Sequence, residues 1–118
     1  TNEPISLTDI ARRFEPDNSS YLIQSWLRGR NTIEFLGEWE RNNDKKFNEE
    51  VFQKLLKNVR APFYTLAPKR MIETVNAIGL ESKRGKNYDT MAHLFIACDF
   101  EMWNNMQFRY EVLKYFMS

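Results

Sequence analysis

Apolar residues recur at spacings of three and four positions along most of the chain, and a period of about 3.6 residues is typical of amphipathic helices. Such helices bury their apolar stripes against one another, so this pattern strongly constrains the architecture. In 118 residues there is material for one ordinary hydrophobic core, and we predict a single domain over residues 1–118. The stripes are Leu7, Ile10, Ala11 and Phe14; Leu22, Ile23, Trp26 and Leu27; Ile33, Leu36 and Trp39; Val51, Phe52, Leu55, Leu56 and Val59; and Met71, Ile72, Val75 and Ile78.

The second and third stripes are separated by Arg28-Gly29-Arg30-Asn31-Thr32, where the apolar pattern stops. Gly29 weakens a helix by about 1 kcal/mol relative to alanine. Asn31 and Glu34 have the spacing of a capping box, which marks the start of a helix. The segment is therefore either one long helix with a weak middle or two helices joined at Gly29.

Other helix ends are indicated by residues that favour such positions. Thr8 and either Ser19 or Ser20 carry hydroxyls that can accept a bond from an unpaired amide, so we expect them to cap the first two helices. Pro68 suits the first turn of a later helix, and Gly79 suits a left-handed C-cap at its end.

The C-terminal part of the chain contains its longest apolar run. A helix starting at Thr90 or His93 would be so apolar that we expect nearly all of it to be buried. Asn104 is expected to cap a last helix. The apolar residues of the two helices are Leu94, Phe95, Ile96, Ala97, Cys98 and Phe100, then Phe108, Val112, Leu113 and Phe116.

The stretch Ser82–Tyr88, which we call the basic turn, departs from the helical pattern. It holds Lys83, Arg84 and Lys86 around Gly85, without an acidic residue. Glycine adopts positive φ at little cost, as a tight hairpin turn requires. Such a turn would present three cations to phosphate oxygens, as a nucleic-acid-binding wing does; the alternative is an ordinary solvated turn.

Taken together, these elements predict an α+β fold: a helix-rich, winged helix-turn-helix-like domain with a small antiparallel hairpin. Phe63–Leu66 has the aromatic and β-branched content of a short strand or extended loop, and Pro4–Leu7 reads as a short extended segment.

Charge and composition limit the class of protein. The net charge of +1 argues against massive non-specific nucleic-acid binding, so any basic surface must come from clusters that folding brings together. The lone Cys98 excludes an intramolecular disulfide, and an intracellular protein is expected. Because the chain begins at Thr1 without a methionine, we expect a fragment of a longer protein. Removal of an N-terminal targeting segment is an alternative explanation of this start.

Catalytic chemistry finds little support in the residues. His93 is the sole histidine and is expected at a helix start or core edge, and Cys98 lies in the most apolar run, where a thiol is inert. We find no glycine-rich phosphate loop and no zinc-ligand spacing. We therefore expect no enzyme, no cofactor and no metal.

Two stretches of the sequence carry a resemblance to a known family. Trp26-Leu27-Arg28-Gly29-Arg30-Asn31-Thr32-Ile33-Glu34-Phe35-Leu36 and Pro68-Lys69-Arg70-Met71-Ile72-Glu73-Thr74 resemble the two halves of a KilA-N domain, in the right order and over nearly the whole chain. KilA-N domains are DNA-binding modules of phages, large DNA viruses and bacterial mobile elements. They are similar to the fungal APSES domain, which is of winged helix-turn-helix type.

This resemblance implies a recognition helix around residues 24–39 and a wing at residues 82–88. It implies double-stranded DNA as partner, a homodimer if half-sites are spaced for one, and no membrane or small-molecule substrate. It suggests transcription regulation in the cytoplasm of a bacterial or phage-infected cell. The expected base-edge contacts are Arg28, Arg30, Asn31 and Thr32; the expected phosphate contacts are Lys69, Arg70, Lys83, Arg84 and Lys86; and Tyr88 is placed to touch a sugar or base.

The sequence departs from the family pattern beside the wing. Asn87 and Asp89 replace the two glycines that usually precede the Ala92-His93 pair. We expect these replacements to stiffen the wing or to weaken its hold on DNA. The competing function is a protein-interaction module, which an exposed apolar face on the last helix would favour.

Overall fold

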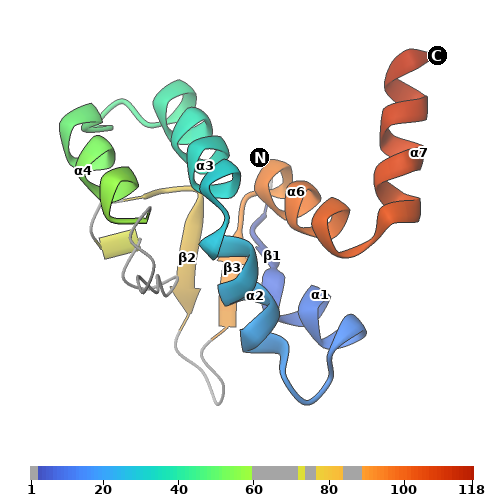
Figure 1. Ribbon diagram of the computed structural model, residues 1–118. Coiled ribbons are helices and arrows are strands. Elements are labelled where there is room, and N and C mark those ends of the chain that lie inside the picture. Colours follow the sequence, from blue (N-terminus) through green and yellow to red (C-terminus); the bar gives the residue numbers. More distant parts are fainter. Residues whose placement is uncertain (1–2, 60–71, 74–76, 84–88) are drawn as a thin grey trace.

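The structure is a computed structural model, which describes residues 3–59, 72–73, 77–83 and 89–118. It is helix-rich with a small antiparallel sheet, so the expected α+β class is confirmed (Figure 1). Within the described residues, none of the helices has the length and apolar character needed to span a membrane. The elements are β1 (Ile5–Ser6), α1 (Leu7–Phe14), α2 (Ser19–Arg28), α3 (Arg30–Asn43), α4 (Glu49–Val59), β2 (Leu80–Lys83), β3 (Asp89–Ala92), α6 (Leu94–Asn104) and α7 (Met106–Met117).

The sheet has the strand order β1-β3-β2, with both neighbouring pairs antiparallel. In the β2–β3 hairpin, Leu80 pairs with Ala92 and Lys83 pairs with Asp89. The predicted hairpin is thus confirmed, since the two strands enclose the basic turn. Residues 84–88 of that turn lie outside the described residues, as do the predicted strand at 63–66 and the helix start at Pro68.

The helical stripes meet in one core, as their spacing predicts. Trp26 and Phe100 are fully buried, and their rings pack edge to face with 5.1 Å between the centroids. The indole Nε1 of Trp26 donates a hydrogen bond to Oδ2 of Asp99, at 3.1 Å. Other fully buried side chains of this core are Leu7, Leu27, Ile33, Leu36 and Ile96.

The segment around Gly29 forms two helices, so of the two alternatives the joined pair is confirmed. Gly29 has extended backbone angles (φ −70°, ψ 125°) and is the N-cap of α3. The change of direction lets both Trp26 of α2 and Ile33 of α3 reach the core. The capping box predicted for Asn31 and Glu34 is wrong, because α3 starts one residue before Asn31.

The first helix also begins earlier than predicted. Ser6, not Thr8, caps α1, and its Oγ accepts from the Asp9 amide at 3.0 Å. Thr8 is buried, and its Oγ1 instead accepts from the backbone N–H of Thr90 at 2.9 Å, which ties α1 to β3. Strand β1 ends at Ser6, so the helix can start directly after it.

Two further caps are shifted by one residue. The N-cap of α2 is Asn18 rather than Ser19 or Ser20. The N-cap of α7 is Asn105, whose Oδ1 accepts from the Phe108 amide at 3.0 Å, while Asn104 is the last residue of α6. Adjacent residues with similar capping ability make such one-residue choices undecidable from local sequence.

The expectation that nearly all of the helix after the hairpin is buried is wrong. α6 packs against α1, β1 and β3 through Ile96, Ala97 and Phe100, whereas Leu94 and Phe95 are 49% and 58% exposed. α7, all of which is described, contacts α6 but has no buried residue, and it projects from the molecule in Figure 1. Apolar composition predicted burial of α6, but among the described residues one side of each of these helices is left exposed.

Gly79 is not a left-handed C-cap, because its φ lies outside the left-handed region. It sits where the backbone passes close to the core: a Cβ at this position would lie 2.5 Å from Cδ1 of Ile96 and 2.8 Å from Cζ3 of Trp39. Its amide donates to Oε2 of Glu40 at 2.7 Å. Glycine is needed here for the close approach.

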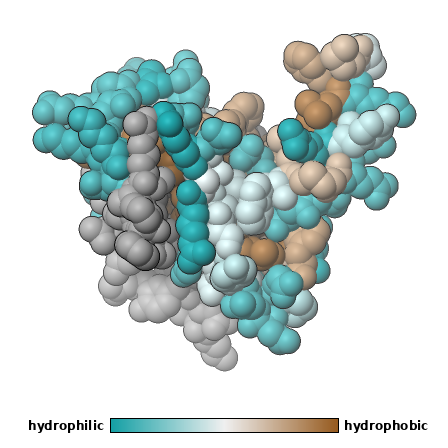
Figure 2. Space-filling view, in the orientation of Figure 1, coloured by the Kyte–Doolittle hydropathy of each residue, from teal (hydrophilic) through white to brown (hydrophobic). Residues whose placement is uncertain are grey.

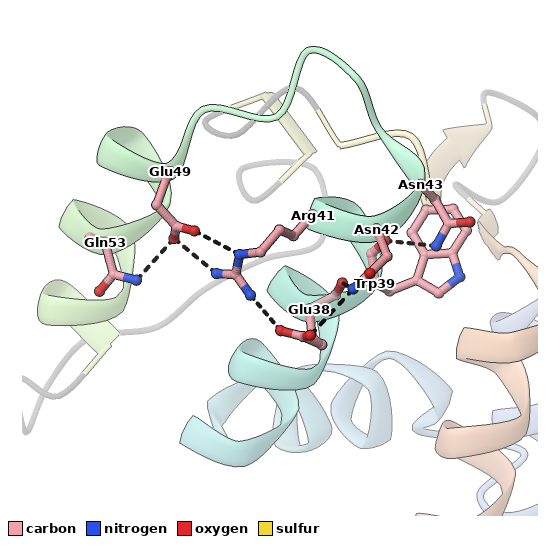
Figure 3. A network of polar contacts seen from close by, with 7 residues as sticks. All are labelled: Glu38, Trp39, Arg41, Asn42, Asn43, Glu49 and Gln53. Atoms are coloured by element: carbon pink, nitrogen blue, oxygen red, sulfur yellow. Dashed lines mark hydrogen bonds and ion pairs between the residues drawn. The ribbon is translucent and has the colours of Figure 1, made fainter.

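An ion pair joins α4 to the C-terminal half of α3 (Figure 3). Arg41 donates from Nε and Nη2 to the two carboxylate oxygens of Glu49, at 2.7 and 2.9 Å, and Gln53 also donates to Glu49. These bonds lower the pKa of Glu49 to about 2. The contact lies at the end of α3 away from its junction with α2.

Candidate nucleic-acid interface

The junction of α2 and α3, residues 28–32, is here called the corner. It carries four of the predicted base-contacting residues. Arg28, Arg30 and Asn31 are exposed, whereas Thr32 is 8% exposed, which makes its hydroxyl the least available of the four. Because Gly29 ends one helix and caps the next, both arginines lie within one residue of the bend.

The N-terminus of α3 is electrostatically unusual. Gly29 supplies no side-chain hydrogen bond to the first turn, and that turn contains no acidic residue. The amides at a helix N-terminus carry a partial positive charge, which an anion would neutralise. Since Arg28 and Arg30 add two full positive charges beside these amides, the corner favours an anionic partner.

Arg30 is held by a local ion pair. Its Nε lies 3.0 Å from Oε1 of Glu34, one turn further along α3, and both side chains are about half exposed. An exposed pair of this kind contributes only ~0–1 kcal/mol, so a phosphate or a guanine edge can replace the carboxylate. Within the described part of the chain, Arg28 has no ion-pair partner.

At the root of the hairpin the structure brings together residues that sequence reasoning did not connect. Nη2 of Arg12, in the last turn of α1, lies 3.7 Å from Oδ1 of Asp89, and Nη1 of Arg12 bonds to Asp9 at 3.1 Å. The charge of Asp89, which was expected to oppose the basic turn, is therefore partly compensated. Arg12 and Asp89 are far apart in the chain, and no local pattern indicates their contact.

Not all predicted contact residues can be placed. Lys83 is the last residue of β2 and pairs with Asp89 in the sheet. The other predicted phosphate contacts and the predicted aromatic contact lie outside the described residues: Lys69, Arg70, Arg84, Lys86 and Tyr88.

The corner and the open end of the β2–β3 hairpin lie at different levels of the molecule in Figure 1. In Figure 1, β2 ends and β3 begins at the lower side of the molecule, and α2 runs from that side up to its junction with α3.

The remaining groups of chemical interest have structural roles. The Nδ1 of His93 accepts from the Phe95 amide at 3.1 Å and caps α6, as predicted for a helix-start group. Burial raises the pKa of the Cys98 thiol, which is half-buried. In the described segments, no group of three or more potential metal-ligating side chains is found.

In the comparison with protein families, the family model of the KilA-N domain matches residues 1–118, the whole chain. Comparisons with curated proteins and with solved structures find no significant match.

Proposed function

Because the chain belongs to the KilA-N domain family, whose members are DNA-binding modules, we propose that residues 1–118 form a single domain that reads the sequence of double-stranded DNA. The domain acts by binding and not by catalysis, and it needs no cofactor or metal for this. Its role is transcription regulation inside the cell that holds the target DNA, and its origin in a phage or mobile element follows the family.

The observation that carries this proposal is the uncapped N-terminus of α3 between two exposed arginines. Arginine offers a planar fork of donors that matches both phosphate oxygens and the N7 and O6 edge of guanine. Arg28, Arg30 and Asn31 therefore read base edges in the major groove, and the first amides of α3 bind a phosphate. Thr32 is buried, which leaves its hydroxyl the least accessible of the four proposed base contacts.

The wing completes the interface. β2 ends and β3 begins at the lower side of the molecule, whereas the corner lies at the upper end of α2 (Figure 1). The proposed arrangement has the corner in the major groove and the wing beside the flanking backbone. The proposed phosphate contacts are Lys69, Arg70, Lys83, Arg84 and Lys86, with Tyr88 against a sugar or base.

A selection of binding sites from random duplexes at about 150 mM salt tests DNA binding and sequence preference together, since non-specific binding is weak under these conditions. We expect an enriched motif. Arg28→Ala should relax preference at one position, at a cost of ~1–3 kcal/mol, whereas Lys86→Ala should weaken all sequences alike and reduce the salt slope by about one.

The matched control is Lys54→Ala, because Lys54 is an exposed lysine on α4, a helix that forms neither the corner nor the hairpin. The proposal is wrong if the chain binds duplex no more tightly than a charge-matched control protein. It is also wrong if Lys86→Ala and Lys54→Ala have equal effects at every salt concentration.

One observation favours a second function. The exposed apolar side chains of α7 are what an interaction module without intrinsic DNA binding would present. In that case the partner would be a protein, and the corner and wing would be incidental. Failure of the duplex selection together with an intact fold is the result that would support this reading.

A further inference from the structure

We propose that Arg109 of α7 is a further phosphate contact of the DNA interface, on the side of the corner that faces this helix. The inference rests on the proposed function and deepens it, because it brings the C-terminal helix into the same interface. None of the contacts expected from the sequence lies on α7. What points to Arg109 is its freedom from ion pairs, its place in a groove shared with the corner, and the side of the corner on which it lies.

Ion pairing separates the arginines that the structure describes into two groups. Arg28 and Arg109 are exposed, and within the described segments neither forms an ion pair with a carboxylate. A guanidinium in this state can bind a phosphate without first giving up a carboxylate partner. The arginines that do form ion pairs are Arg12, Arg13, Arg30 and Arg41.

Arg109 and the corner line the same groove. The groove has a volume of about 420 Å³, and its walls include Asn31 and Thr32 of the corner, Asp99 of α6 and Arg109 of α7. In Figure 2, which has the orientation of Figure 1, α7 rises at the upper right with an open hollow between it and the rest of the molecule. Arg109 is therefore directed to the space beside the corner.

One face of α7 is turned to this groove, and Arg109 is its charged residue. The residues that α7 contributes to the groove are Met106, Arg109 and Leu113, which follow one another at spacings of three and four positions. Such residues are neighbours on one side of a helix. Lys114 is exposed but does not line the groove, because five positions along a helix correspond to a rotation of about 140° from Arg109.

Asp99 connects this face of α7 to the last turn of α2. Its Oδ2 accepts the hydrogen bond from Nε1 of Trp26 at 3.1 Å, and Trp26 is two residues before Arg28. Burial raises the pKa of Asp99, and the bond from Trp26 and the positive charge of Arg109 oppose this rise. The charge of Arg109 thus acts on the same carboxylate that Trp26 contacts. Since Asp99 and Arg109 form no ion pair among the described contacts, the guanidinium stays available to a phosphate.

The two backbones that border a major groove give this placement its function. A protein element inside the groove has one phosphate backbone on each side. In Figure 1 the open end of the β2–β3 hairpin lies below the corner, whereas α7 stands to the right of it. The wing therefore serves one backbone and Arg109 serves the other. Phosphate contacts on both sides fix the orientation of the corner relative to the bases.

Anisotropy titrations of the selected duplex at about 50–300 mM salt test this role. Arg109→Ala should weaken binding about threefold to tenfold at about 150 mM salt and reduce the salt slope by about 0.9, as for one lost phosphate contact. A scrambled duplex should lose affinity by the same factor, because phosphates carry no sequence information. Lys114→Ala is the matched control, since it removes one exposed cation from the other side of the same helix and should leave the salt slope unchanged.

A conservative variant separates charge from packing. Arg109→Lys should keep most of the affinity, because an ammonium also binds phosphate as a point charge. The urea midpoint of Arg109→Ala should equal that of the wild type, since the side chain is exposed. A lysine variant as weak as the alanine variant, or an alanine variant with a lowered urea midpoint, would overturn the assignment of Arg109 as a phosphate contact.

Ethylation interference, in which single phosphates of the duplex are neutralised, locates the contact. The phosphates whose effect disappears in Arg109→Ala should lie on the other backbone from those whose effect disappears in Lys86→Ala. Loss at the same phosphates in both variants would overturn the proposal, as would equal salt slopes in Arg109→Ala and Lys114→Ala. In either case the proposed function stands if the wild type binds duplex, whereas a wild type that binds none overturns both.

Discussion

The carboxylate of Glu40 accepts a hydrogen bond from the backbone N–H of Gly79, with 2.7 Å between Oε2 and the amide nitrogen. The preceding amide, that of Ile78, lies 2.9 Å from Oε1 of the same carboxylate. Glu40 is on α3 and 2% exposed, and Gly79 immediately precedes β2. One buried side chain thus connects α3, which begins at the corner, to the start of the β2–β3 hairpin.

We expect Glu40→Ala to lower the free energy of unfolding by about 1–3 kcal/mol, because it leaves buried backbone donors without an acceptor. Urea denaturation measures this loss. Glu34→Ala is the control on the same helix: its exposed pair with Arg30 is worth ~0–1 kcal/mol, so it should cost clearly less. Equal losses in the two variants would contradict the role given to Glu40.

The stability of the domain should depend on the ionisation of Glu40. Burial raises the pKa of Glu40 above its usual value of 4.5, and it outweighs the opposing effect of the two amide bonds. A group that holds its proton more tightly in the folded state stabilises the fold at low pH. That contribution is complete below the unfolded-state pKa and is lost as pH rises through the folded-state pKa.

The free energy of unfolding of the wild type should therefore fall relative to that of Glu40→Gln as pH rises above 4.5. Urea denaturation of both proteins at several pH values between about 4 and 7 gives the difference directly. The pKa of Asp99 is also raised by burial, but both proteins share that contribution, so it cancels. A difference that is constant with pH would show that Glu40 does not titrate in this way.

Gly37→Ala should destabilise the contact between α3 and α4. A Cβ on Gly37 would lie 2.1 Å from Cζ of Phe52, so either the ring or the helix must move. Overpacking of this kind costs about 1–3 kcal/mol. Thermal or urea unfolding measures it, and the double variant Gly37→Ala/Phe52→Leu should recover part of the loss. No recovery in the double variant would mean that the ring is not the obstacle.

If the proposed function is correct, Asp89→Asn should tighten duplex binding by about threefold or more at low salt. The substitution removes a negative charge from the root of the hairpin and releases Arg12, now 3.7 Å from that carboxylate, for phosphate. Fluorescence anisotropy at several salt concentrations would measure the change, which should shrink as salt rises. Glu50→Gln on α4, also the removal of one exposed acid, should have no such effect.

Much of the fold was predictable because its signals are local. The spacing of Leu22, Ile23, Trp26 and Leu27 identifies an amphipathic helix, and the loss of that spacing at Gly29 identifies its end. The two strands on either side of the basic turn were predicted because Gly85 lies between two extended flanking segments. Helix caps were less predictable, since Ser6 and Thr8 have similar chemistry and the strand that precedes α1 decided between them.

The candidate site was predictable only in its residue types. Exposed arginines near a helix start can be read from the sequence, but the missing cap on α3 and the ion pair of Arg30 are properties of the folded chain. The pairing of Arg12 with Asp89 and the bonds from Glu40 to the amides before β2 join distant segments. Nothing near any of these residues in sequence indicates its partner.

The order of apolar and polar residues along the chain decides which segments become helices, which face of each is apolar, and where the hairpin turns, because backbone geometry acts between near neighbours. Whether an apolar face is then covered depends on which elements pack beside it. α6 is apolar enough to be a core helix, yet Leu94 and Phe95 on it are exposed, and α7, which packs against α6, has no buried residue. Packing between distant segments therefore settled the burial of Glu40, the compensation of Asp89 and the exposure of α7.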